Sequence, residues 1–278
     1  MTTVNSKFIV NELFHYPVKS FAGESISSAS VLAAGFEFDR HWMLVDEEGQ
    51  FLSQRKNPAM ALLKAYIEEE QLILSIPGQS AIAINLLPDD NWRSVKVWND
   101  QLKALNIDAA ADKLVSQFMK KTCHLVVMSK QQQRTISDPA AQGIVSFADA
   151  FPYLLIGTKS LATLNNKLDK QVVIQNFRPN IVVSTSSAHE EDFWHEIMIG
   201  GVRFKNVKLC GRCILTTVDP ETGLRSADQE PLKTLLSYRQ ATNSEVLFGC
   251  NLVAMNEGRI YQGDQLVVLS YKDQQRFN

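Results

Sequence analysis

The chain has 278 residues, of which 45% are hydrophobic, so it is long enough for two domains that each bury a core. A formal net charge of −2 leaves no broad basic surface, which excludes double-stranded nucleic acid as a principal partner and makes any anion-binding site local. No stretch of the sequence is long and apolar enough to cross a bilayer.

The N-terminus and the cysteines indicate where the protein works. Met1–Val10 has no basic region followed by a long apolar run, so we do not expect a secretory signal. The four cysteines are too few and too scattered for a disulfide framework, which fits a reducing compartment. We therefore expect a cytoplasmic protein whose thiols are free or bound to a metal.

The first half of the chain consists of short apolar runs separated by turn residues, a pattern typical of antiparallel strands. Glu47-Glu48-Gly49 and Pro77-Gly78 are the predicted turns. The predicted strands are Phe8–Tyr16, Trp42–Val45, Phe51–Leu52, Leu72–Ile76 and Ala81–Ile84. This half is therefore expected to form a small barrel or sandwich.

A change of period marks the boundary between the two halves. Over Asp108–Met119 the apolar residues follow a helical spacing instead of alternating. The polar run Ser129–Asp138 comes shortly afterwards and is an alternative boundary. We place the two domains at residues 1–123 and 124–278.

Two further helices are predicted in the second half. The first begins at Thr158 or Ser160, either of which can cap it. The second follows Asp228 and has Pro231 in its first turn. The leucines expected to be buried are Leu161, Leu164 and Leu168 in the first helix and Leu232, Leu235 and Leu236 in the second.

The rest of the second half reads as β structure, with Gly200-Gly201 as a hairpin turn. The predicted strands are Val172–Ile174, Ile181–Ser184, Ile197–Ile199, Val202–Phe204, Ile214–Val218, Val253–Met255, Arg259–Tyr261 and Gln265–Leu269. The chain is therefore expected to be mixed α/β and rich in strands.

The segment Lys208–Pro220 carries the most chemistry, because Cys210-Gly211-Arg212-Cys213 places thiols and a guanidinium in one turn. A thiolate binds soft metals, and a neighbouring guanidinium lowers the pKa of the thiol and can hold an oxyanion. A redox dithiol should open a helix, whereas a strand is predicted here, and structural zinc needs a second pair of ligands. Two inert buried thiols remain the main alternative.

Asn176-Phe177-Arg178-Pro179-Asn180 is the second candidate, at a predicted bend before an apolar strand. A guanidinium and two amides that converge on a turn can bind a polar heterocycle or a phosphate. In the alternative interpretation Arg178 pairs with a carboxylate and the asparagines only close the turn.

The third candidate joins Tyr16-Pro17-Val18-Lys19-Ser20, at the end of the first strand, with Asp39-Arg40-His41-Trp42. If the strands are neighbours, Lys19, Ser20 and Arg40 present two cations and a hydroxyl to an anion. Alternatively, Asp39 and Arg40 form an ordinary surface ion pair.

Two weaker patterns complete the search. His189–Glu196 lacks the histidine spacing of a zinc protease helix, and we interpret it as a solvated acidic loop with Trp194 packed inward. Cys123-His124 precedes an apolar run and is expected at a core edge. The absence of P-loop, dinucleotide-binding and nucleophile-elbow motifs disfavours nucleotide hydrolysis, dinucleotide binding and serine hydrolysis.

The ordered set of these segments resembles the MOSC family, the molybdenum cofactor sulfurase C-terminal domain proteins, together with their N-terminal β-barrel domain. Within that family the chain is most similar to the mitochondrial amidoxime-reducing component and its bacterial relatives. The segments that carry the resemblance are Tyr16–Ser20, Asp39–Trp42, Pro152–Ile156, Asn176–Asn180, Cys210–Pro220 and Leu247–Gly249. It implies a β-barrel-like domain followed by a MOSC β-barrel with a few peripheral helices.

The resemblance also implies a site for a molybdenum–molybdopterin cofactor. Cys213 becomes both the molybdenum ligand and the catalytic residue, and Cys210 a neighbour. The residues implied to contact the rest of the cofactor are Lys19, Ser20, Arg40, Asp149, Ala150, Phe151, Arg178, Asn180, Gly211, Arg212 and Asn251. These residue types fit the cofactor, because its phosphate is bound by cationic and amide donors and molybdenum is bound by soft thiolates.

Relatives of this kind imply a molybdenum-dependent reductase of N-hydroxylated small molecules such as amidoximes, hydroxylamines and N-hydroxylated bases. Four cysteines do not suit an iron–sulfur cluster once Cys213 binds molybdenum, so electrons are expected from a separate ferredoxin, flavodoxin, cytochrome or flavin reductase. The alternatives are a sulfur carrier that acts through a cysteine persulfide and a non-catalytic cofactor carrier. Pyridoxal phosphate binding, often associated with the domain, has no supporting lysine motif here.

Overall fold

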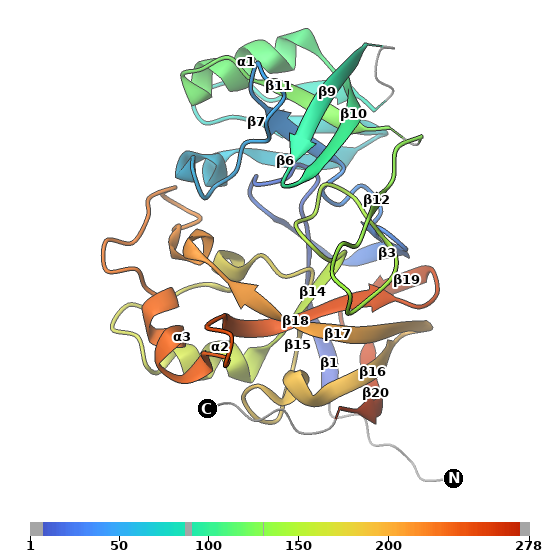
Figure 1. The fold of residues 1–278 in the computed structure, drawn as a ribbon, viewed down its shortest axis with the longest axis vertical. Coiled ribbons are helices and arrows are strands. Elements are labelled where there is room, and N and C mark those ends of the chain that lie inside the picture. The colour runs from blue at the N-terminus through green and yellow to red at the C-terminus, as the bar shows by residue number, and fades with distance from the viewer. Residues whose placement is uncertain (1–7, 87–90, 130, 273–278) are drawn as a thin grey trace.

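The computed structural model describes residues 8–86, 91–129 and 131–272. Residues 1–7 of the N-terminal segment discussed above therefore lie outside the described residues. Figure 1 shows two β-rich parts, one with α1 and β9–β11 and the other with β14–β18. Within the described ranges, no helix is long and apolar enough to span a membrane.

The larger part is a closed barrel. Seven strands follow one another in the order β15-β14-β18-β17-β16-β20-β1, and β15 also pairs with β1, which closes the ring. Their bounds are β1 (Phe8–His15), β14 (Tyr153–Gly157), β15 (Ile181–Val183), β16 (Trp194–Ile199), β17 (Val202–Arg212), β18 (Val246–Ala254) and β20 (Gln265–Tyr271). Closure leaves this set of strands without an open edge between β15 and β1.

The barrel interior explains why these sequences form strands. Val202 and Phe204 alternate with more exposed residues along β17, and both belong to one buried apolar cluster with Leu13 and Trp194. Gly200 lies in the β16–β17 turn with a positive φ of 55°, so the predicted hairpin at Gly200-Gly201 is confirmed. The strand β2 (Glu24–Ile26) extends the sheet beyond β1.

The smaller part contains two sheets around a second core. One is four-stranded, in the order β5-β11-β10-β9, and the other is the three-stranded β6-β7-β8. Their bounds are β5 (Trp42–Val45), β6 (Lys64–Glu68), β7 (Gln71–Ser75), β8 (Ile82–Asn85), β9 (Trp92–Val97), β10 (Asp100–Asn106) and β11 (His124–Met128). Trp42, Leu72 and Leu125 contribute to one apolar cluster between them. The β-rich expectation is confirmed in both halves.

The predicted helix of the first half is also present. α1 (Ala109–Met119) begins after Asp108, whose carboxylate accepts a hydrogen bond of 2.7 Å from the Ala111 N–H. Ala111 and Val115 are buried against the core. The short helix η1 (Pro58–Leu62) precedes β6.

Strand pairing does not follow a single cut of the chain. β1 lies in the barrel, whereas β11 pairs with β5 and β10 in the other part. A third small sheet, β19-β3-β4, joins β3 (Ser28–Leu32) and β4 (Gly35–Phe36) to β19 (Gly258–Tyr261), and β12 (Arg134–Thr135) pairs with β13 (Ile144–Val145). The division at residues 123 and 124 stays a prediction.

Two predicted strands are wrong, and a third, Phe51–Leu52, is reduced to an isolated bridge between Phe51 and Val45. Ile214–Val218 forms the 3₁₀ helix η4 (Ile214–Thr217), because the Thr216 and Thr217 hydroxyls donate to carbonyls three residues earlier, at 3.0 and 2.7 Å. Val172–Ile174 leads instead into η2 (Ile174–Phe177), where the Asn176 side chain accepts from the Val173 N–H at 3.2 Å. Local hydrogen bonds override the β-branched pattern in both places.

The helices of the second half differ from expectation in detail. Neither Thr158 nor Ser160 caps α2 (Thr158–Asn165): the Lys159 N–H donates to Thr185 Oγ1 at 3.2 Å, and the buried Glu191 carboxylate accepts from the Gly157 N–H at 2.9 Å and from Ser160 Oγ at 2.6 Å. Leu168 lies beyond its end. In α3 (Leu232–Arg239) Leu235 is buried, but Leu236 is 44% exposed because it lies on the outer face.

The acidic loop is not fully solvated. Trp194 is buried as predicted, but the preceding helix η3 (Glu190–Phe193) also buries Glu191 and Asp192. Asp192 accepts a hydrogen bond of 2.6 Å from the Arg239 guanidinium, which compensates part of the cost of burying its charge. Burial raises the pKa of Glu191 to about 7.

Candidate active site

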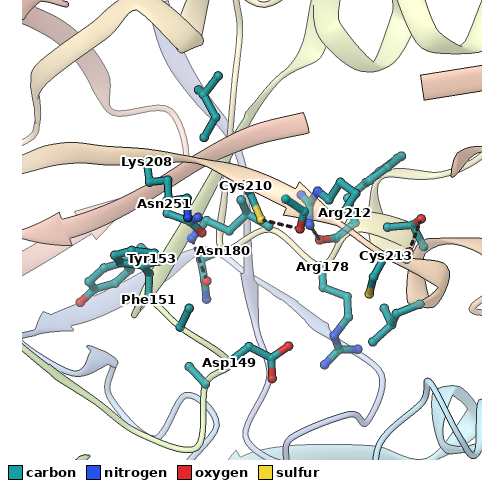
Figure 2. A pocket seen from close by; sticks show the side chains of 18 of the residues that line it. Asp149, Phe151, Tyr153, Arg178, Asn180, Lys208, Cys210, Arg212, Cys213 and Asn251 are labelled. Atoms are coloured by element: carbon teal, nitrogen blue, oxygen red, sulfur yellow. Dashed lines mark hydrogen bonds between the residues drawn. The ribbon is translucent and has the colours of Figure 1, made fainter. Parts of the chain in front are cut away.

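A pocket of about 330 Å³ lies where the two parts meet, a size within the range of small-molecule sites. Figure 2 shows that side chains from β17, from the Arg178–Asn180 turn and from the Asp149–Phe151 segment project toward it. Every residue implied by the resemblance lines this pocket: Lys19, Ser20, Arg40, Asp149, Ala150, Phe151, Arg178, Asn180, Gly211, Arg212, Cys213 and Asn251. The fold therefore brings together segments that are far apart in sequence, such as those carrying Lys19 and Asn251.

Arg212 is held at the end of β17 with one donor to spare. Its Nε donates to the Phe248 carbonyl at 2.8 Å, and Nη1 donates to the Phe177 carbonyl at 3.2 Å. Nη2 is buried and has no hydrogen-bond partner among the described residues. Burying a charged donor without a hydrogen-bond partner costs free energy of folding, and an anionic ligand that accepts from Arg212 Nη2 would recover it.

The two thiols occupy different positions. Cys213 lies between β17 and η4, is half-buried and lines the pocket. Figure 2 shows it apart from Cys210, whose Sγ lies 3.7 Å from the Gly211 carbonyl. Burial raises the pKa of the Cys210 thiol, which disfavours the reactive thiolate. The predicted strand after the motif is absent, so it cannot serve as the argument against a redox dithiol. The separation of Cys210 from Cys213 argues against that pairing instead.

The Arg178–Asn180 turn binds backbone and side chains of the first half. Arg178 has a positive φ of 56° and donates from Nη1 to the Phe21 carbonyl at 2.6 Å. Asn180 accepts from Arg40 Nη1 at 2.9 Å and donates to Asp39 at 3.2 Å. Arg178 therefore bonds to a carbonyl and not to a carboxylate, and burial lowers its pKa to about 10.

Arg40 and Lys19 both form ion pairs at this seam. Arg40 pairs with Asp39, but Asp39 is only 2% exposed, so this is a buried pair and not the surface pair considered above. Lys19 pairs with Asp149 and donates to the Phe147 carbonyl at 2.8 Å. The Asp149 side chain is half exposed, and the neighbouring Lys19 ammonium holds its pKa well below its usual range.

Arg55 also belongs to the site, with Trp98 packed behind it, and no motif in the sequence pointed to either residue. Arg55 lines the pocket, donates to Asp149 at 3.3 Å and lies over the Trp98 ring at 4.5 Å. The Trp98 indole donates to Asp149 at 3.2 Å. Both residues lie outside any of the motifs, so only the fold brings them to Asp149.

Cys123 and His124 lie outside the pocket lining. The Cys123 backbone N–H bonds to Ser116 Oγ at 3.0 Å, and His124 Nδ1 lies 2.7 Å from the Asp112 carboxylate. Cys123 is buried in the core around Trp42. His124 is partly exposed at the predicted core edge, whereas Cys123 lies within the core.

Comparison with known families agrees with this architecture. The MOSC N-terminal beta barrel domain matches residues 7–122, and the MOSC domain matches residues 142–267. Mitochondrial amidoxime-reducing component 1 of Mus musculus is 34% identical over 94% of this chain and 82% of its own length. The chain belongs to the MOSC family. Mitochondrial amidoxime reducing component 2 of Bos taurus is 35% identical and that of Homo sapiens 36%, each over 85% of this MOSC protein and 74% of the relative.

Family membership connects the pocket to a cofactor. MOSC proteins with amidoxime-reducing relatives are associated with the molybdenum cofactor, and the described pocket supplies a thiol and several cationic donors. The family resemblance predicted from the sequence motifs is thus confirmed. The roles of the individual pocket residues stay predictions.

Proposed function

We propose that this MOSC protein reduces N-hydroxylated small molecules, with a molybdenum–molybdopterin cofactor in the pocket and electrons from a separate redox protein. The names of the relatives supply the reaction class. The observation that carries the proposal is that the half-buried Cys213 and Arg212, whose buried Nη2 has no partner among the described residues, line the same pocket. A soft ligand and an anion donor in one pocket are what this cofactor requires.

The pocket residues fit the cofactor by chemical type. In the proposal Cys213 is the metal ligand, and the anionic part of the group is held by donors that already face the pocket: Lys19, Ser20, Arg40, Arg178, Asn180 and Arg212. The rest of the pocket wall consists of Asp149, Ala150, Phe151, Gly211 and Asn251. Of these, Ala150, Phe151 and Gly211 can contribute only packing or backbone groups. When bound, the cofactor supplies the redox chemistry that cleaves an N–O bond.

The protein's own contribution is binding and orientation. The ion pair of Lys19 with Asp149 fixes the segment that carries Asp149–Phe151, and Arg55 reinforces it. The hydrogen bonds of Asn180 fix Arg40 relative to the barrel. Preorganised donors of this kind hold an anion without reorganising when it binds.

Sulfur transfer is the weaker candidate. A persulfide carrier needs a reactive thiolate, but burial raises the pKa of Cys210.

We propose a reducing, cytoplasmic location for the protein, supported by four cysteines that are all free.

The proposal is tested by turnover of an amidoxime by the cofactor-loaded protein. We expect activity with a chemical one-electron reductant or a reduced partner protein, and none with NADH alone. The Cys213→Ser variant should lose activity, and Cys210→Ser should retain most of it. Activity with NADH alone would refute the separate electron donor, and inactivity of Cys210→Ser alone would favour sulfur transfer.

A further inference from the structure

The most unusual arrangement near the pocket is a tyrosine ring shared by two arginines. Tyr16 is fully buried. The guanidinium carbon of Arg40 lies 4.2 Å from its ring centroid, and that of Arg178 lies 4.4 Å from the same centroid. Both arginines line the pocket, although Tyr16 itself does not.

Tyr16 is tied to both arginines through the backbone as well. The Arg40 N–H donates to the Tyr16 carbonyl at 2.7 Å, and the Tyr16 hydroxyl donates to the Pro179 carbonyl at 3.0 Å, next to Arg178. The Tyr16 N–H donates to the Asp39 carboxylate at 2.9 Å. One residue therefore connects the end of β1, the Arg40 segment and the Arg178 turn.

The two guanidinium groups need this support because they repel each other. Arg40 has the Asp39 carboxylate, but Arg178 makes no ion pair within 4 Å among the described residues. An aromatic face attracts cations through its quadrupole, and the attraction is strongest where water is excluded. Asp39 and Asp149 act on Arg178 only from beyond ion-pair distance, so the face of Tyr16 is the electron-rich group in direct contact with its guanidinium.

We propose that Tyr16 is a positioning residue, whose electron-rich ring holds Arg40 and Arg178 together as one anion-binding unit for the cofactor. The proposal rests on the cofactor site proposed above. It assigns the effect to the ring and not to the hydroxyl, which bonds the Pro179 carbonyl and neither guanidinium group.

The test separates the ring's electrostatics from its shape. Position 16 is replaced by phenylalanine and then by phenylalanines carrying one, two and three fluorines, which change ring size little but progressively remove the attraction for cations. The cofactor-loaded protein is diluted, and the rate of pterin release is followed by fluorescence, alongside the thermal midpoint of the cofactor-free protein. We expect Tyr16→Phe to release pterin at nearly the wild-type rate, and the trifluoro variant roughly tenfold faster.

A matched control uses another tyrosine with a cation over its ring. Tyr238 lies 5.1 Å from Lys167 Nζ and does not line the pocket, so the same fluorine series there should leave pterin release unchanged. A flat release rate across the position-16 series would overturn the positioning role. Equal falls in the thermal midpoint of the cofactor-free protein across that series would also overturn it, because they would mean loss of packing. Wild-type protein that binds no pterin would instead refute the cofactor proposal itself.

Discussion

At the scale of single residues, the pocket is distinguished by groups whose bonding capacity is not used up. Arg212 donates two hydrogen bonds, to the Phe248 carbonyl of β18 and to the Phe177 carbonyl of η2, and its buried Nη2 has no partner among the described residues. Planar guanidinium geometry makes both uses possible at once, which a lysine cannot do. Arg212 is therefore the side chain most sensitive to conservative substitution.

Arg212→Lys should weaken cofactor retention by about ten- to a hundredfold, because a charge-assisted hydrogen bond contributes about 1.5–3 kcal/mol. Bound pterin per chain after extensive dialysis measures the effect. Arg203→Lys is the control, since Arg203 pairs with Glu196 on the exposed face of β16 and β17. Equal pterin content in Arg212→Lys and wild type would contradict the anion-binding role.

Glu191 predicts an unusual pH dependence of stability. Its pKa is raised by burial to about 7, above the ordinary carboxyl value of 4.5. The folded state therefore holds a proton that the unfolded state releases, and stability falls as the pH rises from about 4.5 to 7. His189, whose pKa burial lowers to about 4, acts in the opposite direction over part of this range.

The contribution of Glu191 is isolated by comparison with Glu191→Gln, which keeps an oxygen for the Gly157 and Ser160 hydrogen bonds. The difference in thermal midpoint between wild type and variant should shift in favour of the variant as the pH rises from 5 to 7.5. A difference independent of pH over that range would show that Glu191 is ionised in the folded protein at pH 5.

At the scale of elements, the pattern of the sequence predicted most strands but failed beside the site. The β-branched run after Cys213 has strand composition, yet hydroxyl-to-carbonyl bonds turn it into η4 and place Cys213 at the start of a tight turn. Composition does not reveal which hydroxyl will bond locally, because that depends on Asn176 donating to the Thr216 and Val218 carbonyls. The motif could be located from sequence, but its conformation could not.

Thr216→Val tests the turn, because it removes a buried hydroxyl and preserves the side-chain shape. We expect a loss of about 1 kcal/mol in the free energy of unfolding, measured by denaturant titration. Thr222→Val, at an exposed position, should stay within about 0.5 kcal/mol. A loss at position 222 as large as that at 216 would show that the Thr216 hydroxyl bond does not stabilise the turn.

At the scale of the whole molecule, the site exists because distant segments close one barrel and meet a second part. The β1–β15 pairing joins Val10 to Val183, and no local pattern specifies a partner so far along the chain. The pocket-lining residues could be listed from motifs, whereas the Arg55–Trp98 contact and the Tyr16 ring between two arginines follow only from the assembled fold.

Because the pocket is lined by both parts, cofactor removal should loosen both sides of the seam. A ligand that binds only the folded state stabilises it by mass action. We expect a lower thermal midpoint in the cofactor-free protein and faster hydrogen exchange in both residues 16–20 and 176–180. Exchange that changes on one side alone would mean that the cofactor contacts only that part.

In the proposed function Cys213, and not Cys210, is the protein ligand of molybdenum. X-ray absorption spectroscopy of the loaded protein counts the sulfur atoms around the metal directly. We expect one sulfur fewer around the metal in Cys213→Ser than in wild type and an unchanged count in Cys210→Ser. An unchanged count in Cys213→Ser, or the loss of one sulfur in Cys210→Ser, would contradict it.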